Sequence, residues 1–182
     1  MNTKLIPKMS PSSAKLSVLV ARDRACVKVA GRANFTFGPD FKKLLTGLGQ
    51  KGYCHFTIDL SECVLMDSTF LGVLAGFGLA TNPGGDPDKR QIELLNPNAR
   101  ITELLENLGV LHLFRTATGQ LPAPEDAKPA TPEPLNPTPE QITRTCLEAH
   151  QTLMAANPDN VARFKDVAAF LAEDLKNLEK PK

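Results

Sequence analysis

The pattern of apolar and polar positions over residues 55–81 predicts a strand, a short polar break and then a buried helix. The strand is indicated by a period of two, in which polar residues alternate with Phe56, Ile58 and Leu60. Gly72 and Gly76 lie four apart in the apolar run that follows, which favours close packing of this helix on another backbone segment. The break at residues 66–69 places hydroxyl groups at the helix start, where free N–H groups and the helix dipole favour negative charge.

Comparable patterns on both sides predict further strands and helices. Strands are expected at residues 16–21, 25–31, 91–95 and 113–117, the first two joined by a turn at 22–24. Helices are expected to begin at Gly38 and after Asn98, and to end at Gly49 or Gly52 and at Gly109. Strands that alternate with helices after an opening hairpin predict an α/β domain over residues 14–118, with a mixed sheet and parallel crossovers.

The C-terminal third of the chain is different in character. Residues 119–137 are rich in proline and poor in large apolar side chains, which predicts a semi-extended linker. Thr138 and Gln141 then have the spacing of a capping box at a helix start. A second helix carries a heptad seam, formed by Val161, Phe164, Ala168, Leu171, Leu175 and Leu178. Two short helices cannot bury both stripes against each other, so we expect this hairpin, residues 138–180, to dock on the preceding domain or on a second copy of the chain.

Composition narrows the class of partner. The chain has 182 residues, of which 42% are hydrophobic, enough for one domain with an appendage. Its formal net charge is +1 with no basic or acidic block, which argues against binding to nucleic acid or to a membrane surface. The apolar segment 64–80 is too short to span a bilayer, and residues 1–13 suggest a loose leader without signal-peptide character. We therefore predict a cytoplasmic protein.

No residue pattern predicts catalysis, a cofactor or a metal site. The four cysteines include no C-x-x-C pair and the three histidines are scattered, so free thiols without a metal or a disulfide are expected. No P-loop, no G-x-S-x-G and no H-E-x-x-H occurs. Asp59 and Glu62 lie close together at a strand end, where structural roles are favoured over general acid and base chemistry.

The polar break resembles a known family. The run Asp59-Leu60-Ser61 is followed by Asp67-Ser68-Thr69-Phe70-Leu71-Gly72. These residues resemble the D-L-S and D-S-[ST]-G-L-G marks of STAS domains, the bacterial anti-sigma factor antagonists. Phe70 stands where the family usually has glycine, which reshapes the expected partner surface. The resemblance extends over roughly residues 14–118.

The resemblance implies a site at the helix start. It places the phosphorylated serine at Ser68, with Thr69 as the second choice. It also implies that the unphosphorylated chain binds an anti-sigma factor of the serine kinase type through Asp67, Ser68, Thr69, Phe70 and Gly72, releasing a sigma factor. The ATP would belong to the kinase. A purely structural interpretation makes Ser68 the helix N-cap and Asp67 its partner in the cap.

Two other functions are compatible with the same residues. In the first, the chain is a STAS accessory subunit of a membrane transport complex, whose helix docks on an ATPase without phosphorylation. In the second, it is a scaffold subunit that assembles through its C-terminal helices, for instance as a homodimer.

Overall fold

The protein, here a computed structural model, is described over residues 14–84, 86, 91–121, 125–130 and 135–180. The predicted leader lies outside these residues. The strands are β1 (Lys15–Ala21), β2 (Arg24–Ala33), β3 (His55–Asp59), β4 (Cys63–Met66), β5 (Ile92–Leu95), β6 (Arg115–Ala117) and β7 (Lys128–Ala130). The helices are α1 (Gly38–Gln50), α2 (Ser68–Thr81), α3 (Ala99–Asn107), α4 (Pro139–Ala156) and α5 (Asp159–Leu178), with short 3-10 helices η1 (Phe35–Phe37) and η3 (Leu111–Leu113).

The strands of the described residues form one mixed sheet in the order β6-β5-β3-β2-β1-β7, and β4 pairs separately with β2. Strands β1 and β2 are antiparallel and are joined at Arg22 and Asp23, where Arg22 takes a left-handed φ of 52°. Strands β2, β3, β5 and β6 are parallel, with α1, α2 and α3 in the connections between them. The predicted α/β class with a mixed sheet is therefore confirmed.

The core lies between the sheet and helices α1, α2 and α3. Alternate residues of β2 and β3, such as Val27 and Ile58, are fully buried together with Phe41 of α1, Leu74 of α2 and Ile101 of α3. Burial of side chains of this size stabilises the fold by about 1.5–3 kcal/mol each. Of the described helices, none combines the length and apolar character needed to cross a membrane.

Two short strands were not expected from the sequence. Strand β4 pairs in parallel with the end of β2, and its four residues are too few to show a period. Strand β7 lies within the proline-rich segment and pairs antiparallel with β1, so part of that segment is an edge strand of the sheet. Pro129 has no N–H to donate, and proline is tolerated at such an edge.

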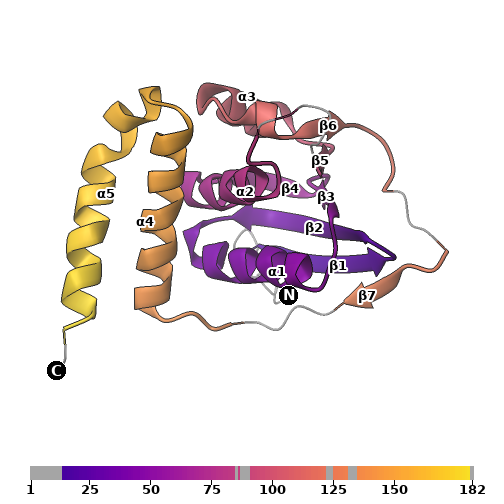
Figure 1. Cartoon of the computed structure of the whole chain (residues 1–182), viewed down its shortest axis with the longest axis horizontal. Helices are drawn as coiled ribbons and strands as arrows, with labels where there is room; N and C mark the ends of the chain where they lie inside the picture. The colour runs from indigo at the N-terminus through magenta and orange to yellow at the C-terminus, as the bar shows by residue number, and fades with distance from the viewer. Residues whose placement is uncertain (1–13, 85, 87–90, 122–124, 131–134, 181–182) are drawn as a thin grey trace, which may run out of the picture.

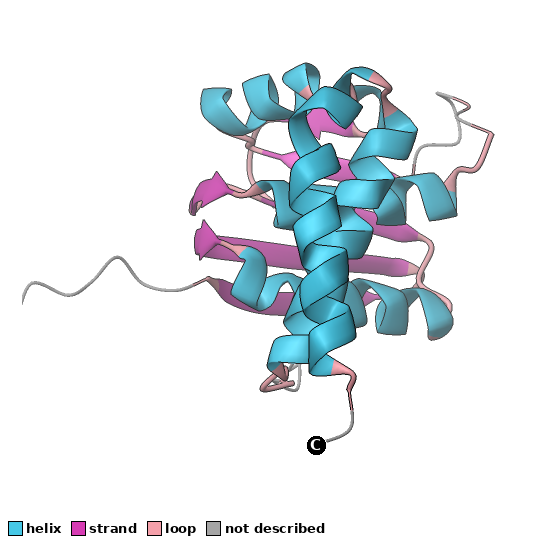
Figure 2. Ribbon diagram, turned by 90° about the vertical axis from the view of Figure 1, so that its left-hand side faces the viewer, coloured by secondary structure: helices cyan, strands magenta, loops and turns pink. Residues whose placement is uncertain are grey.

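The predicted C-terminal helical hairpin is confirmed, and it docks on the same chain. Thr138 and Gln141 form the expected capping box at the start of α4. Helix α4 packs mainly on α2 and also contacts α1 and η1. Figure 1 shows α4 and α5 side by side next to α1 and α2, and Figure 2, turned so that the hairpin faces the viewer, shows it lying across the rest of the molecule. Ala168 and Leu175, in the middle of the heptad seam, are buried.

Candidate functional site

Asp67 organises the start of α2. Its backbone is extended, and its Oδ1 accepts from the N–H of Phe70 at 2.9 Å, so Asp67 is the N-cap. Its Oδ2 accepts from the N–H of Phe35 at 2.5 Å, which ties η1 to the same point. The structural interpretation of Ser68 as the N-cap is therefore wrong. Ser68 is the first helical residue, because the side-chain acceptor lies one position earlier.

The carboxyl group of Asp67 is partly withdrawn from water. Burial raises the pKa of Asp67, and the hydrogen bonds from Phe70, Phe35 and Thr69 oppose that rise only in part. The start of α2 thus already carries an acidic group in a poorly solvated place. Any further negative charge on Ser68 would be added beside it.

Ser68 makes its side-chain contact with the C-terminal hairpin. The Oγ of Ser68 lies 2.9 Å from Nε2 of His150 in α4. The Nδ1 of His150 lies 2.7 Å from the carbonyl oxygen of Cys146, and because a carbonyl only accepts, Nδ1 is the donor. In the neutral ring Nε2 is then the acceptor, so the Ser68 hydroxyl donates to it. His150 is 6% exposed. The sequence does not predict this pairing, because the two residues are 82 positions apart.

Thr69 and Phe70, also expected at the partner surface, lie inside the molecule. They are 3% and 0% exposed. The ring of Phe70 stacks on that of Phe41, with centroids 4.2 Å apart and planes at 15°. In this chain the aromatic side chain at position 70 therefore fills the space between α1 and α2, and in the described conformation it does not reach the surface.

Gly72 allows α4 to approach α2 backbone to backbone. A Cβ atom added at Gly72 would lie 2.6 Å from the carbonyl oxygen of Ala149, and one at Gly76 would lie 3.5 Å from Cγ2 of Thr152. The predicted close packing of this glycine face is confirmed, and its partner is α4. The structure thus brings the expected site residues together in the first turns of α2, where Ser68 and Gly72 face the hairpin and Phe70 faces α1.

The packing under α4 is incomplete. A cavity of about 270 Å³ lies between α1, α2 and α4, with Leu45, Val73 and Thr145 among the residues that line it. At its rim Lys42 of α1 forms an ion pair with Glu148 of α4, and both side chains are about half exposed. Exposed pairs of this kind contribute little, typically about 0–1 kcal/mol.

The described residues contain one group of side chains that could together hold a metal ion, Asp23, Cys54 and His55. Nδ1 of His55 lies 2.9 Å from Oδ2 of Asp23 and 3.4 Å from Sγ of Cys54. Because both neighbours contact the same ring nitrogen, the group cannot act as a relay through the imidazole. The side chains of Asp23 and His55 are about half exposed, and the absence of a metal stays a prediction.

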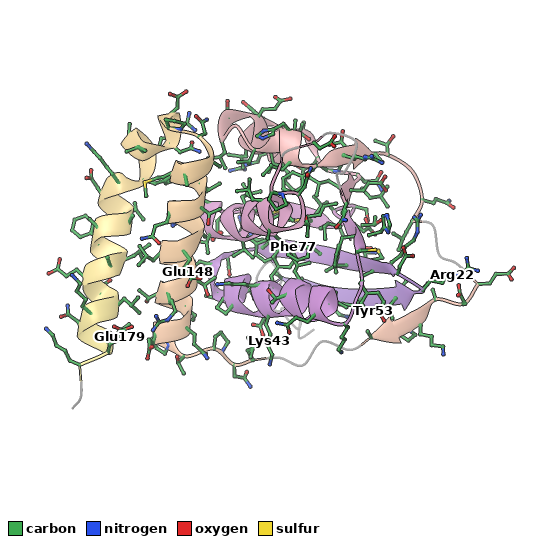
Figure 3. All side chains as sticks on the ribbon, viewed as in Figure 1. Arg22, Lys43, Tyr53, Phe77, Glu148 and Glu179 are labelled. Atoms are coloured by element: carbon green, nitrogen blue, oxygen red, sulfur yellow. The ribbon has the colours of Figure 1, made fainter. Side chains whose placement is uncertain are left out.

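This group is remote from the start of α2. Figure 3 labels Arg22, beside Asp23, at one end of the molecule and Glu148 of α4 toward the other. Asp59 and Glu62 have structural contacts, as expected: Oδ1 of Asp59 accepts from the N–H of Ser61 at 3.0 Å, and Glu62 pairs with Lys28 at 2.6 Å.

Comparison with known proteins gives similarities of fold. No protein-family model matches the chain, and no curated protein matches it significantly. The crystal structure of a candidate anti-sigma factor antagonist from Thermotoga maritima is similar at a TM-score of 0.45 and 20% identity, over 58% of this chain and 84% of that one. The NMR structure of the same protein is similar at a TM-score of 0.45 and 18% identity, over 64% of this chain and 89% of that one.

A crystal structure of an anti-sigma factor antagonist from Mycobacterium paratuberculosis is similar at a TM-score of 0.48 and 18% identity, over 64% of this chain and 92% of that one. These proteins are described as members of the class that residues 59–72 resemble. Similarity at this level concerns the fold, so a function has to be argued from the residues themselves.

Proposed function

We propose that this chain is an anti-sigma factor antagonist that works in the cytoplasm as a phosphorylation-controlled partner switch and has no catalytic activity of its own. The observation that carries the proposal is the position of the D-S-T residues. Asp67 caps α2 and Ser68 opens it, directly after a strand that pairs with β2. In the proposed cycle the unphosphorylated start of α2 binds an anti-sigma factor with kinase activity, and phosphorylation of Ser68 ends that binding.

A phosphate on Ser68 should affect the free energy of partner binding more than the stability of the fold. It adds close to two negative charges at pH 7, and the N-terminus of α2 favours negative charge by about 0.3–1 kcal/mol. Asp67 lies beside it and opposes this gain. At a partner interface, a dianion that must be desolvated costs several kcal/mol. A loss of about 3 kcal/mol weakens binding more than a hundredfold, at about 1.4 kcal/mol for each factor of ten.

The test is capture of a partner from a lysate of cells that carry the kinase, with intact-mass measurement of the recovered chain. Ser68→Asp is expected to capture the anti-sigma factor much more weakly than the parent. Ser17→Asp is the matched control, because it adds the same charge at an exposed position in β1. Peptide mapping should place the phosphate on Ser68, or on Thr69 as the second choice.

Other outcomes separate the alternatives. If Ser68→Asp captures its partner as tightly as Ser17→Asp, or if phosphate is mapped elsewhere, the partner switch is wrong. Recovery of a transport ATPase by the unphosphorylated chain would instead support an accessory subunit of a transport complex. Recovery of the chain alone as a stable oligomer would support a scaffold role.

A further inference from the structure

The C-terminal hairpin covers the face of α2 on which the proposed partner would dock. We propose that the α4–α5 hairpin is an intramolecular occupant of this face, and that it must move away before Ser68 can be modified or a partner helix can bind. The identity of the partner rests on the proposed function. The shielding of Ser68 by α4 does not, and it can be measured without any partner.

The contacts follow one stripe along α2. Ser68, Gly72 and Gly76 are each four residues apart and meet His150, Ala149 and Thr152 of α4. This spacing places all three on one helix face. The stripe accepts a helix because its glycines have no Cβ: at Gly72 an added Cβ would lie within 2.8 Å of three Ala149 atoms. The occupant of the surface is thus a helix that presents small side chains, and a competing partner should present the same.

The docked hairpin leaves Ser68 half-buried, with α4 against its side chain. Its hydroxyl is hydrogen-bonded to His150, and that ring is held in place on two further sides. Nδ1 donates to the carbonyl of Cys146, and the ring contacts Phe164 of α5 with centroids 4.9 Å apart. In the observed position of the Ser68 side chain, a phosphoryl group on Oγ would collide with the His150 ring, which lies 2.9 Å from that oxygen. The docked state is therefore one in which Ser68 is protected from a kinase.

Opening the interface exposes Leu153 of α4, which is fully buried in the core, so the open state is the minor one. On α2 the contact stripe is formed by a hydroxyl and two glycines, and the cavity of about 270 Å³ beneath α4, which Val73 and Phe77 help to line, shows that close contact is not continuous. The other end of the hairpin has its own attachment. Nδ2 of Asn160 donates to the carbonyl of Leu108 at 2.9 Å, and Nη1 of Arg163 donates to that of Asn107 at 3.2 Å.

The α4–α5 hairpin, as part of the same chain, competes with an external partner helix for the face of α2. A tethered segment has an effective concentration of the order of millimolar, so an external helix binds only in proportion to the fraction of molecules in which α4 is displaced. Variants that displace α4 should consequently increase both the reactivity of position 68 and the affinity for a partner.

The experiment uses the full chain with Ser68→Cys as a reporter. The introduced thiol is alkylated with iodoacetamide and its rate of alkylation is measured by peptide mass spectrometry, with the distant half-buried Cys54 as internal reference. Ala149→Leu places a larger side chain against Gly72 and leaves α2 unchanged. Ala155→Leu is the same substitution at an exposed position of α4 and is the matched control.

A second pair of variants acts from the other side of the contact. Gly72→Ala forces α4 away from α2, whereas Gly47→Ala in α1 meets nothing within 4 Å. We expect Ala149→Leu and Gly72→Ala to raise the alkylation rate of the reporter thiol by about tenfold or more, in proportion to the open fraction. The two control variants should leave it unchanged. Amide exchange in β2 and β3 should stay slow, which shows that the sheet remains folded.

Equal alkylation rates of the reporter thiol in all five chains would overturn the proposal, and so would a rate in the parent as fast as in the denatured chain. Failure of the proposed function has a different signature. There, Ser68→Asp and Ser17→Asp capture the partner equally, while Ala149→Leu still accelerates alkylation of the reporter thiol.

Discussion

At the scale of single residues, Asp67 has a structural task that its position in the motif did not reveal. Its two carboxylate oxygens accept from Phe70 in α2 and from Phe35 in η1, and its own N–H donates to Ala33 of β2. One side chain thus holds the end of a strand, a 3-10 helix and the start of α2 in fixed relation. The neighbouring Ser68 is positioned by this arrangement.

We predict that Asp67→Ala lowers the free energy of unfolding by about 1–2 kcal/mol, since it removes an N-cap and leaves N–H groups unpaired. Asp67→Asn keeps an acceptor for the N–H of Phe70 but turns an NH2 group toward the N–H of Phe35, so it should lose less than Asp67→Ala. Urea unfolding of the three chains at pH 7 measures the difference. Equal losses in both variants would show that the charge matters and the cap does not.

The carboxyl group of Asp67 should also make the free energy of unfolding depend on pH. Burial raises the pKa of Asp67 above 3.8, so the folded state holds the proton more tightly than the unfolded state. The stability contributed by this group is present below pH 3.8 and is lost as the pH rises through the raised pKa. The stability of Asp67→Asn relative to the parent should therefore increase between acidic and neutral pH, as followed by urea unfolding at each pH.

The cysteines give a chemical prediction. Burial raises the pKa of Cys26 to about 12 and that of Cys63 to about 11, so at neutral pH almost none of either is thiolate. Both should react slowly with a thiol reagent in the native chain. All four cysteines should titrate after denaturation without reductant. Fewer than four, or stoichiometric zinc in elemental analysis, would contradict the free-thiol prediction.

At the scale of elements, the two faces of α2 have different partners. Phe70 packs inward on Phe41 of α1, and Gly72 lies against Ala149 of α4. Phe70 is thus a side chain of the core, while Gly72 is the residue that permits the outer contact. Because α2 is packed on two faces, few polar residues interrupt its apolar sequence.

We predict that Phe70→Gly lowers the free energy of unfolding by at least about 4 kcal/mol. Removal of a buried phenyl ring costs about 3–5 kcal/mol, and glycine inside a helix costs about a further 1 kcal/mol. Phe70→Leu should cost much less because most of the volume is kept. Chemical unfolding of the two variants tests this, and a small loss in Phe70→Gly would mean that the stacked pair is not part of the core.

At the scale of the whole molecule, the hairpin adds a layer of helices to the α/β domain. It packs on α2 and α1, and its outer surface carries exposed apolar side chains, Phe170 at 69% and Val167 at 42%. Packing within the same chain accounts for the two buried residues of the heptad seam, Ala168 and Leu175.

We predict that a chain ending at Thr118 still folds, because the sheet and helices α1 to α3 supply most of the core, to which α4 adds Ala149 and Leu153. It should expose the outer face of α2 and lose the pairing of β7 with β1. Binding of an apolar dye and cooperative thermal unfolding check the two parts of this expectation. Loss of cooperative unfolding would show that the hairpin is an integral part of one core.

A chain ending at Pro137 is the matched comparison, since it lacks the hairpin but retains β7. Its stability relative to the chain ending at Thr118 isolates the contribution of the edge strand. Size-exclusion chromatography with scattering on the full chain distinguishes a monomer, in which the hairpin is satisfied on its own domain, from a dimer through α5.

The sequence alone determined the features that repeat locally along the chain. Periods of two and of about 3.6 residues located most strands and helices, the capping box located α4, and the glycine spacing in α2 predicted a close helix contact. These signals are readable because each depends on residues within a few positions of one another. The motif at residues 59–72 likewise pointed to Ser68.

Only the tertiary structure decided which residues distant in the sequence are in contact. Three contacts join residues that are far apart in the chain. Ser68 pairs with His150, Gly72 lies against Ala149, and Asp23 meets Cys54 and His55. Strand β7 likewise exists only because β1 offers an unpaired edge. No local period encodes such contacts, because they depend on how whole elements pack. The contact of α4 with Ser68 and Gly72 is therefore a property of the folded chain.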